Sequence, residues 1–474
     1  MDQTDLCYTQ AIELSRLIGR RELSPVELTD AVLARIERLN PSVNAYLTVT
    51  ADLAREQAKA AEARAMKDER IGPIDGIPYS LKDLEPTNGI RTTFGSKWFE
   101  DNVPTEDGAV AGRMKASGAV LLGKTNTSNF GYKDMGDNMI APPTSNPWKL
   151  DRTSGASSAG AGASVAAGMS PLAHGSDGAG SIRIPASLCG IVGFKPSLGR
   201  IPSYPNADIW SARSHNGPMT RTVRDAAMML QVMAGPDPRD PLSIDAEPDD
   251  YRAACDGDLK GLRVAFSADF GYAAVDPDVR AAFEKSVKRF GLLGCELEAK
   301  DPSWDDPLEF HALIYQVTQA GRQGDRFDEH PDWIEATLKQ MIEAGRRFSG
   351  VDLQKANLKR TVFYHQARSF FESYDLLLTP QMPVGAWSNT PGPEEGPRQI
   401  EGRPTPRMFD RLPFTVPFNL TGQPAITVPC GFTSEGMPIG LQIVGRWHQD
   451  STVLRAAAGF EAMQPWLMKR PPLD

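Results

Sequence analysis

The sequence lacks the closely spaced cysteines and histidines that would indicate a metal site or a disulfide framework. Its 474 residues include 5 cysteines and 6 histidines, and no Cys-x-x-Cys pair occurs. Scattered cysteines of this kind are typical of buried free thiols in a reducing compartment. No group of His, Asp and Glu has the spacing of metal ligands. We therefore expect no metal and no other cofactor.

Long apolar runs and long runs of one charge are also missing. No stretch of about 18 apolar residues could span a membrane, and residues 1–5 are acidic rather than the start of a secretory signal. The net charge is −9, with acidic and basic residues interspersed. This distribution disfavours nucleic acid as a partner. We expect a cytoplasmic protein, monomeric or homodimeric, that binds neither membranes nor nucleic acid.

Local patterns predict helices and strands. Residues 24–27, Ser-Pro-Val-Glu, have the form of a helix start with a capping serine and proline in the first turn. Strand-like segments at 77–82 and 120–122 flank a helical segment at 109–117, which predicts a β-α-β unit and a parallel strand pair. Further helices are predicted at 9–20, 24–38, 51–67, 221–234, 278–292, over most of 304–372 and from 451, further strands at 191–194, 262–266, 425–429 and 439–444, and an exposed loop at 387–406.

A run of tiny residues is the most informative segment. Between residues 154 and 170, all but two positions hold Gly, Ala or Ser. A flexible linker usually carries polar or charged residues, whereas this run has no charge and lies between Trp148 and Leu172. We predict a helix that packs tightly on several sides at the buried centre of an enzyme.

Two hydroxyls and one amine could form a nucleophile system around this run. Ser157 lies inside it, Ser181 ends a Gly-Ala-Gly-Ser turn, and Lys82 ends the strand-like segment 77–82. A serine hydroxyl needs a base to become a nucleophile, and lysine can serve only if burial lowers its pKa. If the three side chains converge, the chain is a hydrolase with a variant of the Ser-His-Asp arrangement.

These segments resemble the amidase signature family, whose hydrolases use a Ser–cis-Ser–Lys triad. The similar stretches cover nearly the whole chain: 77–82, 155–160, 178–181, 183–187, 193–197, 217–219, 378–380 and 438–442. Length alone would suggest two or three domains. The resemblance instead implies one large α/β/α domain, 1–474, with a central mixed, twisted β-sheet and helices on both faces.

The resemblance also implies a division of this domain. N-terminal helices would occupy 1–70 and a signature core 71–235. A variable helical segment on the substrate side would span 300–372, and core strands with a last helix would follow at 373–474.

The resemblance implies a role for each site residue. Lys82 would be the base, Ser157 the bridge after a cis peptide bond from Ala156, and Ser181 the nucleophile. The backbone amides of Gly178, Ala179, Gly180 and Ser181 would form the oxyanion hole.

Three further residues are expected to support this site. Ser158 would support the bridge, while Asp177 and Arg183 would form a structural pair that holds the nucleophile turn. Ala179 stands where the family usually has glycine, which would cost about 1 kcal/mol if that backbone needs a positive φ.

The substrate is less clear from the sequence. Residues 129–138 resemble the family's substrate-facing loop, so Tyr132, Met135, Gly136 and Trp210 are candidates for substrate contact. With aromatics of 304–372 they would form an apolar mouth suited to aryl amides, anilides or carbamates (urethanes), with esterase activity as a side reaction. The alternative that these residues belong to the core stays open.

Two other functions compete with that of a stand-alone amidase. One is the glutaminase subunit of a tRNA-dependent amidotransferase, which commonly has Gln after the arginine of the nucleophile motif. Here Ile184 follows Arg183, which disfavours that function. The other is a catalytically dead binding protein, which the intact Lys82, Ser157 and Ser181 disfavour.

Overall fold

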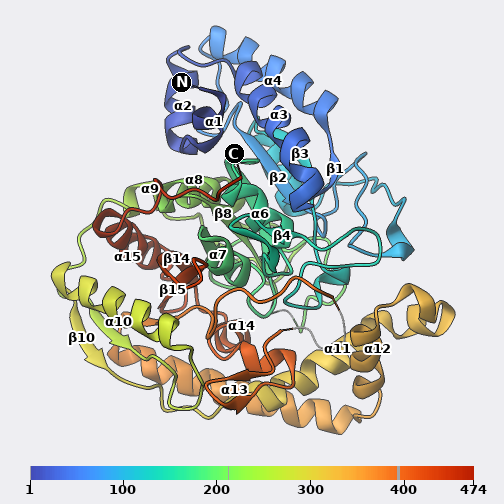
Figure 1. Cartoon of the computed structure of the whole chain (residues 1–474), viewed down its shortest axis with the longest axis vertical. Helices are drawn as coiled ribbons and strands as arrows, with labels where there is room; N and C mark the ends of the chain where they lie inside the picture. The colour runs from blue at the N-terminus through green and yellow to red at the C-terminus, as the bar shows by residue number, and fades with distance from the viewer. Residues whose placement is uncertain (1, 212, 392–395, 474) are drawn as a thin grey trace.

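A mixed β-sheet of 11 strands runs through the protein in a computed structural model that describes residues 2–211, 213–391 and 396–473 (Figure 1). Its strands, in order across the sheet, are β1 (Tyr46–Val49), β3 (Val120–Thr125), β2 (Pro78–Lys82), β6 (Leu172–Asp177), β8 (His215–Thr220), β7 (Val192–Lys195), β14 (Ala425–Phe432), β15 (Pro438–Gly445), β11 (Leu376–Pro380), β9 (Arg263–Phe266) and β10 (Glu296–Ala299). Strand β2 pairs in parallel with β3 and β6, whereas the central strands from β6 to β11 pair antiparallel. The predicted α/β class with a mixed sheet is confirmed.

Helices flank this sheet. The main ones are α1 (Gln3–Tyr8), α2 (Ala11–Gly19), α3 (Pro25–Val43), α4 (Ala51–Met66), α5 (Ala109–Ala116), α6 (Ala159–Ala166), α7 (Arg183–Cys189), α8 (Val223–Met233), α9 (Tyr251–Ala254), α10 (Pro277–Leu292), α11 (Leu308–Glu329), α12 (Ala336–Gly345), α13 (Gly350–Ser373), α14 (Val416–Thr421) and α15 (Asp450–Met463). Helices α6 and α7 contact each other and the central strands, and α8, α10 and α15 form a second group on the sheet. Figure 1 shows α1–α4 at one end of the molecule and α11–α13 at the other.

Most predicted elements are present, and the β-α-β unit is confirmed because β2 and β3 are parallel with α5 between them. Five strands of the large sheet were not predicted as strands: β1, β6, β8, β10 and β11. The signals against β8 and β10 are the clearest. Strand β8 contains Gly217 and Pro218, which argue against a central strand, yet Pro218 lies opposite His174 of β6 and all of β8 is buried. Strand β10 is an edge strand with three exposed residues and shows no inward-facing alternation. Burial in the sheet decides β8, and parallel pairing with β9 decides β10.

The predicted loop at 387–406 is only partly described. Residues 392–395 lie outside the described residues, and a short pair of strands, β12 (Gln399–Ile400) and β13 (Arg403–Pro404), follows them. The segment boundaries expected within the single domain stay predictions.

The start of α3 shows how local chemistry sets a helix boundary. Ser24 Oγ accepts hydrogen bonds from the N–H groups of Val26 at 3.0 Å and Glu27 at 3.3 Å, and Pro25 occupies the first turn. The cap satisfies amides that have no partner inside the helix. The helix continues past the predicted end through Pro41 and stops at Asn44, which adopts the left-handed conformation.

Helix α6 lies within the run of tiny residues, and every one of its residues is buried. Gly160 N–H donates to Asn126 O at 3.0 Å, and Asn126 N–H donates to Ala45 O at 2.8 Å. A Cβ at position 160 would collide with backbone atoms of the same two residues, Ala45 O and Asn126 N. Small residues are therefore needed for α6 to approach the backbone that follows β3.

Replacing Gly160 by alanine should therefore lower the stability of the protein. Backbone atoms cannot move aside as a flexible side chain can, and we expect a loss of about 3 kcal/mol in the free energy of unfolding. Thermal unfolding, followed by differential scanning fluorimetry, measures the effect. The matched control is Gly112→Ala in α5, where the nearest atom to a new Cβ is Asp107 Cβ at 3.9 Å. An equal thermal midpoint for the two variants would refute the packing argument.

Candidate active site

Lys82 is the last residue of β2 and is fully buried. Its Nζ lies 2.7 Å from Ser157 Oγ, 3.0 Å from Ser176 Oγ and 3.1 Å from Ser176 O. Ser176 lies near the end of β6, the parallel neighbour of β2, and the carboxyl ends of parallel strands meet at one edge of a sheet. The strand order therefore places the amine beside hydroxyls from two distant segments.

The environment of Lys82 favours a neutral amine. Burial lowers its pKa to about 7, although the negative charge of Asp177 acts in the opposite direction. No carboxylate in the described part of the chain forms an ion pair with Lys82. A neutral amine carries a lone pair, so it can accept the proton of Ser157.

Ser157 lies at the bottom of a cavity and is 2% exposed. The peptide bond from Ala156 is cis, as expected from the sequence. Gly131 covers the Ser157 hydroxyl, since a Cβ at position 131 would come within 3.2 Å of Ser157 Oγ. The φ of Gly131 is +71°, a conformation that glycine adopts readily.

Ser158 connects the bridge residue with the nucleophile turn. Its N–H donates to Ser181 O at 3.1 Å, its Oγ donates to Ser176 O at 3.2 Å, and it accepts from Ser176 N–H at 3.2 Å. The backbone of Ser181 is thus held beside the residue that follows Ser157. Ser181 itself is half-buried, and its hydroxyl has no hydrogen-bond partner among the described residues. The structure therefore brings Lys82, Ser157 and the Ser181 turn to one place.

The backbone amides of residues 178–181 are not equivalent. Gly180 N–H donates to Asp177 Oδ1 at 2.7 Å and is therefore occupied. In the described structure, the N–H groups of Gly178, Ala179 and Ser181 have no partner, so the candidate oxyanion hole narrows to these three. Gly180 has a φ of +123°, while Ala179 is not among the residues with positive φ. Alanine at position 179 therefore carries no left-handed strain.

Asp177 and Arg183 form the ion pair that the sequence predicts, and both side chains are fully buried. Arg183 Nε lies 2.9 Å from Asp177 Oδ2. The carboxylate also accepts from the N–H groups of Gly180 and Ile182 at 2.7 and 3.2 Å. Burial alone would raise the pKa of Asp177, but the charge and hydrogen bonds of Arg183 hold it well below its usual range. The pair thus fixes both ends of the nucleophile turn.

Residues from the C-terminal half complete this network and were missed in the sequence. Asn419 of α14 donates to Asp177 Oδ1 at 2.9 Å and accepts from Arg183 at 2.6 Å. Gln442 of β15 accepts from Arg183 at 2.7 Å. Thr415 donates to Ala179 O at 2.7 Å. Of these residues, only Gln442 could have been found from the sequence, because it ends the family-like stretch 438–442.

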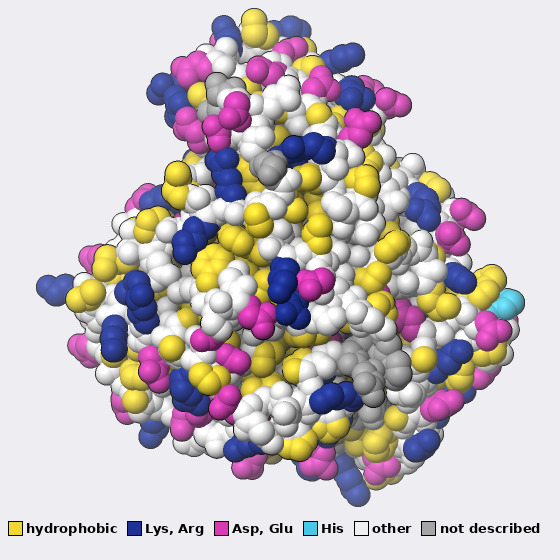
Figure 2. Space-filling view, viewed as in Figure 1, with side chains coloured by type: hydrophobic (Ala, Val, Ile, Leu, Met, Phe, Trp, Pro, Cys, Tyr) yellow, Lys and Arg dark blue, Asp and Glu magenta, His cyan; other side chains and the backbone are white. Residues whose placement is uncertain are grey.

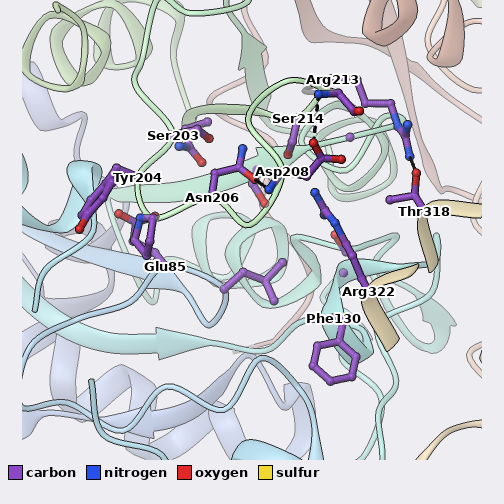
Figure 3. Close-up of a pocket in the computed structure, with 18 of the residues that line it drawn as sticks. Glu85, Phe130, Ser203, Tyr204, Asn206, Asp208, Arg213, Ser214, Thr318 and Arg322 are labelled. Atoms are coloured by element: carbon purple, nitrogen blue, oxygen red, sulfur yellow. Dashed lines mark hydrogen bonds between the residues drawn. The ribbon is translucent and has the colours of Figure 1, made fainter. Parts of the chain in front are cut away.

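Ser157 lines a cavity of about 230 Å³, which is the pocket drawn in Figure 3. Its wall is mixed rather than apolar. Leu84, Phe130 and Tyr315 are among its apolar and aromatic lining residues, and charged groups lie among them: Glu85, Asp208, Arg213 and Arg322. Helix α11 supplies Tyr315, Thr318 and Arg322, so the helical segment 300–372 does reach the cavity.

The four residues expected to touch the substrate lie elsewhere. Met135 and Gly136 are buried, and a Cβ at position 136 would collide with Ala159 of α6. Trp210 is 79% exposed. Tyr132 lines a second cavity and supports the first, because its carbonyl accepts from Tyr315 OH at 2.5 Å. Sequence position could not show which face of the 129–138 segment turns inward.

Among the described residues, no group of three or more His, Cys, Asp and Glu side chains could hold a metal ion. The described helices include none with the length and apolarity to cross a membrane. All five cysteines are free and buried. Figure 2 shows basic and acidic side chains interspersed over the visible face.

Comparisons with known proteins show which family the chain resembles. The profile of the Amidase family matches residues 27–454. The chain is 39% identical to an acylamidase from Rhodococcus erythropolis over 473 residues, which cover 99% of this chain and 98% of that protein. It is 37% identical to a glutamyl-tRNA(Gln) amidotransferase subunit from Moorella thermoacetica, with 99% of each chain covered.

A solved structure shows the same architecture. The crystal structure of a bacterial aryl acylamidase of the amidase signature family superposes with a TM-score of 0.91 at 31% identity, covering 97% of each chain. The profile match, the relatives and this superposition show that the chain belongs to the amidase signature family.

Proposed function

We propose that this amidase signature hydrolase cleaves the C–N acyl bond of small aryl or hydrophobic amides or carbamates through an acyl-enzyme on Ser181. The observation that supports this most strongly is the 2.7 Å contact between Lys82 Nζ and Ser157 Oγ in a fully buried environment. The apolar walls of the cavity, Leu84 and Phe130, suit an aromatic or aliphatic substrate body. The similarity to an acylamidase and to an aryl acylamidase points the same way.

The proposed reaction uses the contact between Lys82 and Ser157. It also requires Ser181 Oγ to meet Ser157 Oγ when the substrate is bound, a contact that is absent from the hydrogen bonds of the described residues. Neutral Lys82 takes the proton of Ser157, and Ser157 takes the proton of Ser181 as its oxygen attacks the carbonyl. The free amides of Gly178, Ala179 and Ser181 hold the oxyanion. The proton returns through Ser157 to the leaving nitrogen, which departs as the amine. Water then attacks the acyl-enzyme through the same relay and releases the acid.

A second candidate is the glutaminase subunit of a tRNA-dependent amidotransferase, favoured by the 37% identity to such a protein. Ile184 after Arg183 disfavours it. The free buried thiols suit a reducing compartment. We propose that the protein acts in the cytoplasm, as a monomer or homodimer, on a small-molecule substrate.

Replacing Lys82 by alanine should lower kcat by about 10²–10⁴-fold, the usual contribution of a general base. In the wild type, the active form of Lys82 is the neutral amine. Because its pKa lies at about 7, kcat should fall about tenfold per unit below pH 7 and level off above it. Initial rates between pH 5 and about 9 measure both effects. The control is Lys115→Ala, an exposed lysine on α5. Near-full activity of the Lys82 variant would refute the assignment.

A sulfonyl fluoride should label Ser181 and no other serine. Ser181 is half-buried and its hydroxyl has no hydrogen-bond partner among the described residues, and the proposed relay through Ser157 makes it nucleophilic. Intact-mass and peptide mapping locate the label. Ser181→Ala should remain unlabelled, and Ser157→Ala should be labelled more slowly because its relay is broken. A label on another serine of the wild type would contradict the proposed nucleophile.

A substrate panel should separate amidase from glutaminase. We expect anilides or aryl carbamates to have a kcat/KM at least about tenfold above that of L-glutamine, because the cavity offers apolar contacts that glutamine cannot use. Primary amides complete the panel, and ammonia or amine release is measured for each substrate. Preference for glutamine, together with co-purification of a partner protein, would establish the alternative.

A further inference from the structure

Arg213 is a buried cation in the substrate cavity without a matching anion. Its side chain is 8% exposed and lines the cavity that holds Ser157. Its Nη2 reaches Thr318 Oγ1 at 3.5 Å, and its guanidinium lies 5.4 Å from the centre of the Tyr315 ring. The described residues give it no ion pair.

Other buried arginines in the described structure are better satisfied. Each of them has a carboxylate or a close carbonyl oxygen as a partner: Arg35 with Ala167 O at 2.6 Å, Arg183 with Asp177 at 2.9 Å, Arg200 with Asp450 at 3.6 Å, Arg221 with Thr9 O at 2.8 Å and Arg411 with Asp134 at 3.0 Å. A buried charge without such a partner is costly and is a sign of function. Arg213 is therefore the exception that needs an explanation.

The groups around Arg213 do not neutralise it. Burial lowers the pKa of Arg213 to about 10, and the charges of Arg360 and Arg322 act in the same direction, while Tyr315 and Asp208 oppose them. Arg360 donates to Leu420 O at 2.8 Å. Arg322 is exposed, lines the same cavity and forms no ion pair with the described residues. Arg360 and Arg322 are thus the cations that act on Arg213, and Asp208 is the carboxylate that opposes them.

The two carboxylates of the cavity are engaged elsewhere. Glu85 accepts from the N–H groups of Val110 and Ala111 at the start of α5, at 3.0 and 3.1 Å. Asp208 accepts from Ser211 N–H at 3.1 Å. Figure 3 shows Arg322 extending towards Asp208, while Arg213 faces Thr318. The Arg213 side chain lines the cavity, and its one hydrogen-bond partner among the described residues is the Thr318 hydroxyl.

We propose that Arg213, assisted by Arg322, binds a carboxylate group of the substrate, so that the enzyme selects amides that carry an anion. This rests on the proposed amidase function and names its substrate class. A guanidinium presents a planar fork that matches a carboxylate, while Leu84 and Phe130 contact the apolar body. The carboxylate can belong to the acyl part, as in the monoamide of a dicarboxylic acid, or to the amine part, as in an N-acyl amino acid.

Matched substrate pairs test the subsite kinetically. Glutaranilic acid and valeranilide differ by a carboxylate on the acyl side, and N-benzoyl-γ-aminobutyrate and N-butylbenzamide differ by one on the amine side. The wild type should prefer the anionic member of one pair. Arg213→Gln should lower the ratio of kcat/KM for the anionic over the neutral member by about 10–100-fold, the effect of losing a charge-assisted hydrogen bond.

Three further variants make the result specific. Arg213→Lys should retain part of the preference, and Arg322→Gln should reduce the ratio less than Arg213→Gln. Arg252→Gln, an exposed arginine of α9 outside the cavity, should leave both rates unchanged. If Arg213→Gln lowers kcat/KM equally for the anionic and the neutral substrate of a pair, the role of Arg213 is only structural and the proposal is overturned.

Binding to the Ser181→Ala variant separates the subsite from the reaction. Isothermal titration calorimetry should detect binding of glutaranilic acid or N-benzoyl-γ-aminobutyrate to this variant. In the double variant that also carries Arg213→Gln, the affinity should be at least about tenfold weaker. Binding that depends on Arg213, without hydrolysis of any amide by the wild type, would support the subsite and refute the amidase proposal. Hydrolysis of the neutral amides with no Arg213-dependent binding would refute the subsite and leave the amidase proposal standing.

Discussion

The burial of one amine organises the site. Lys82 ends a fully buried strand, and its nearest polar atoms are hydroxyl and carbonyl oxygens of Ser157 and Ser176 rather than a carboxylate. Desolvation therefore dominates its pKa and favours the neutral form. An ion pair at the same position would keep the lysine charged and remove its value as a base. The protein around Lys82 must then be tightly packed and must place no carboxylate in contact with the amine. The small residues of α6 make the tight packing possible.

The one strong charge pair of the described site lies just behind the nucleophile turn. Asp177 is paired with Arg183 and bonded to Asn419, so its charge is committed to holding the turn. Its two oxygens also bind the amides of Gly180 and Ile182, which shapes the backbone and leaves other amides free. Rigidity at the turn and neutrality at the lysine therefore come from two adjacent strand ends, β2 and β6.

Sequence patterns predicted the sheet class, the β-α-β unit and the segments that meet at the site. Their success has a local cause, because Lys82, Ser157 and Ser181 each lie in a stretch with distinctive composition. They failed where local signals conflict with burial, as in β8 with Pro218. They did not resolve the cavity wall residue by residue, since Phe130 of the segment 129–138 lines the cavity while Met135 is buried. Tyr315 and Arg213 reach the same cavity from remote segments.

By itself, the sequence determined which reactive groups are present, namely the two serines and the lysine, and supplied the tiny residues that permit close approach. Its resemblance to a family also determined the fold class. Only the tertiary structure decided which of these groups are in contact and which are free. Strand order brings Lys82 to Ser157, Asp177 occupies the Gly180 amide, and the described residues leave the buried Arg213 without an ion-pair partner. The physical reason is that desolvation and hydrogen-bond partnership depend on neighbours far apart along the chain.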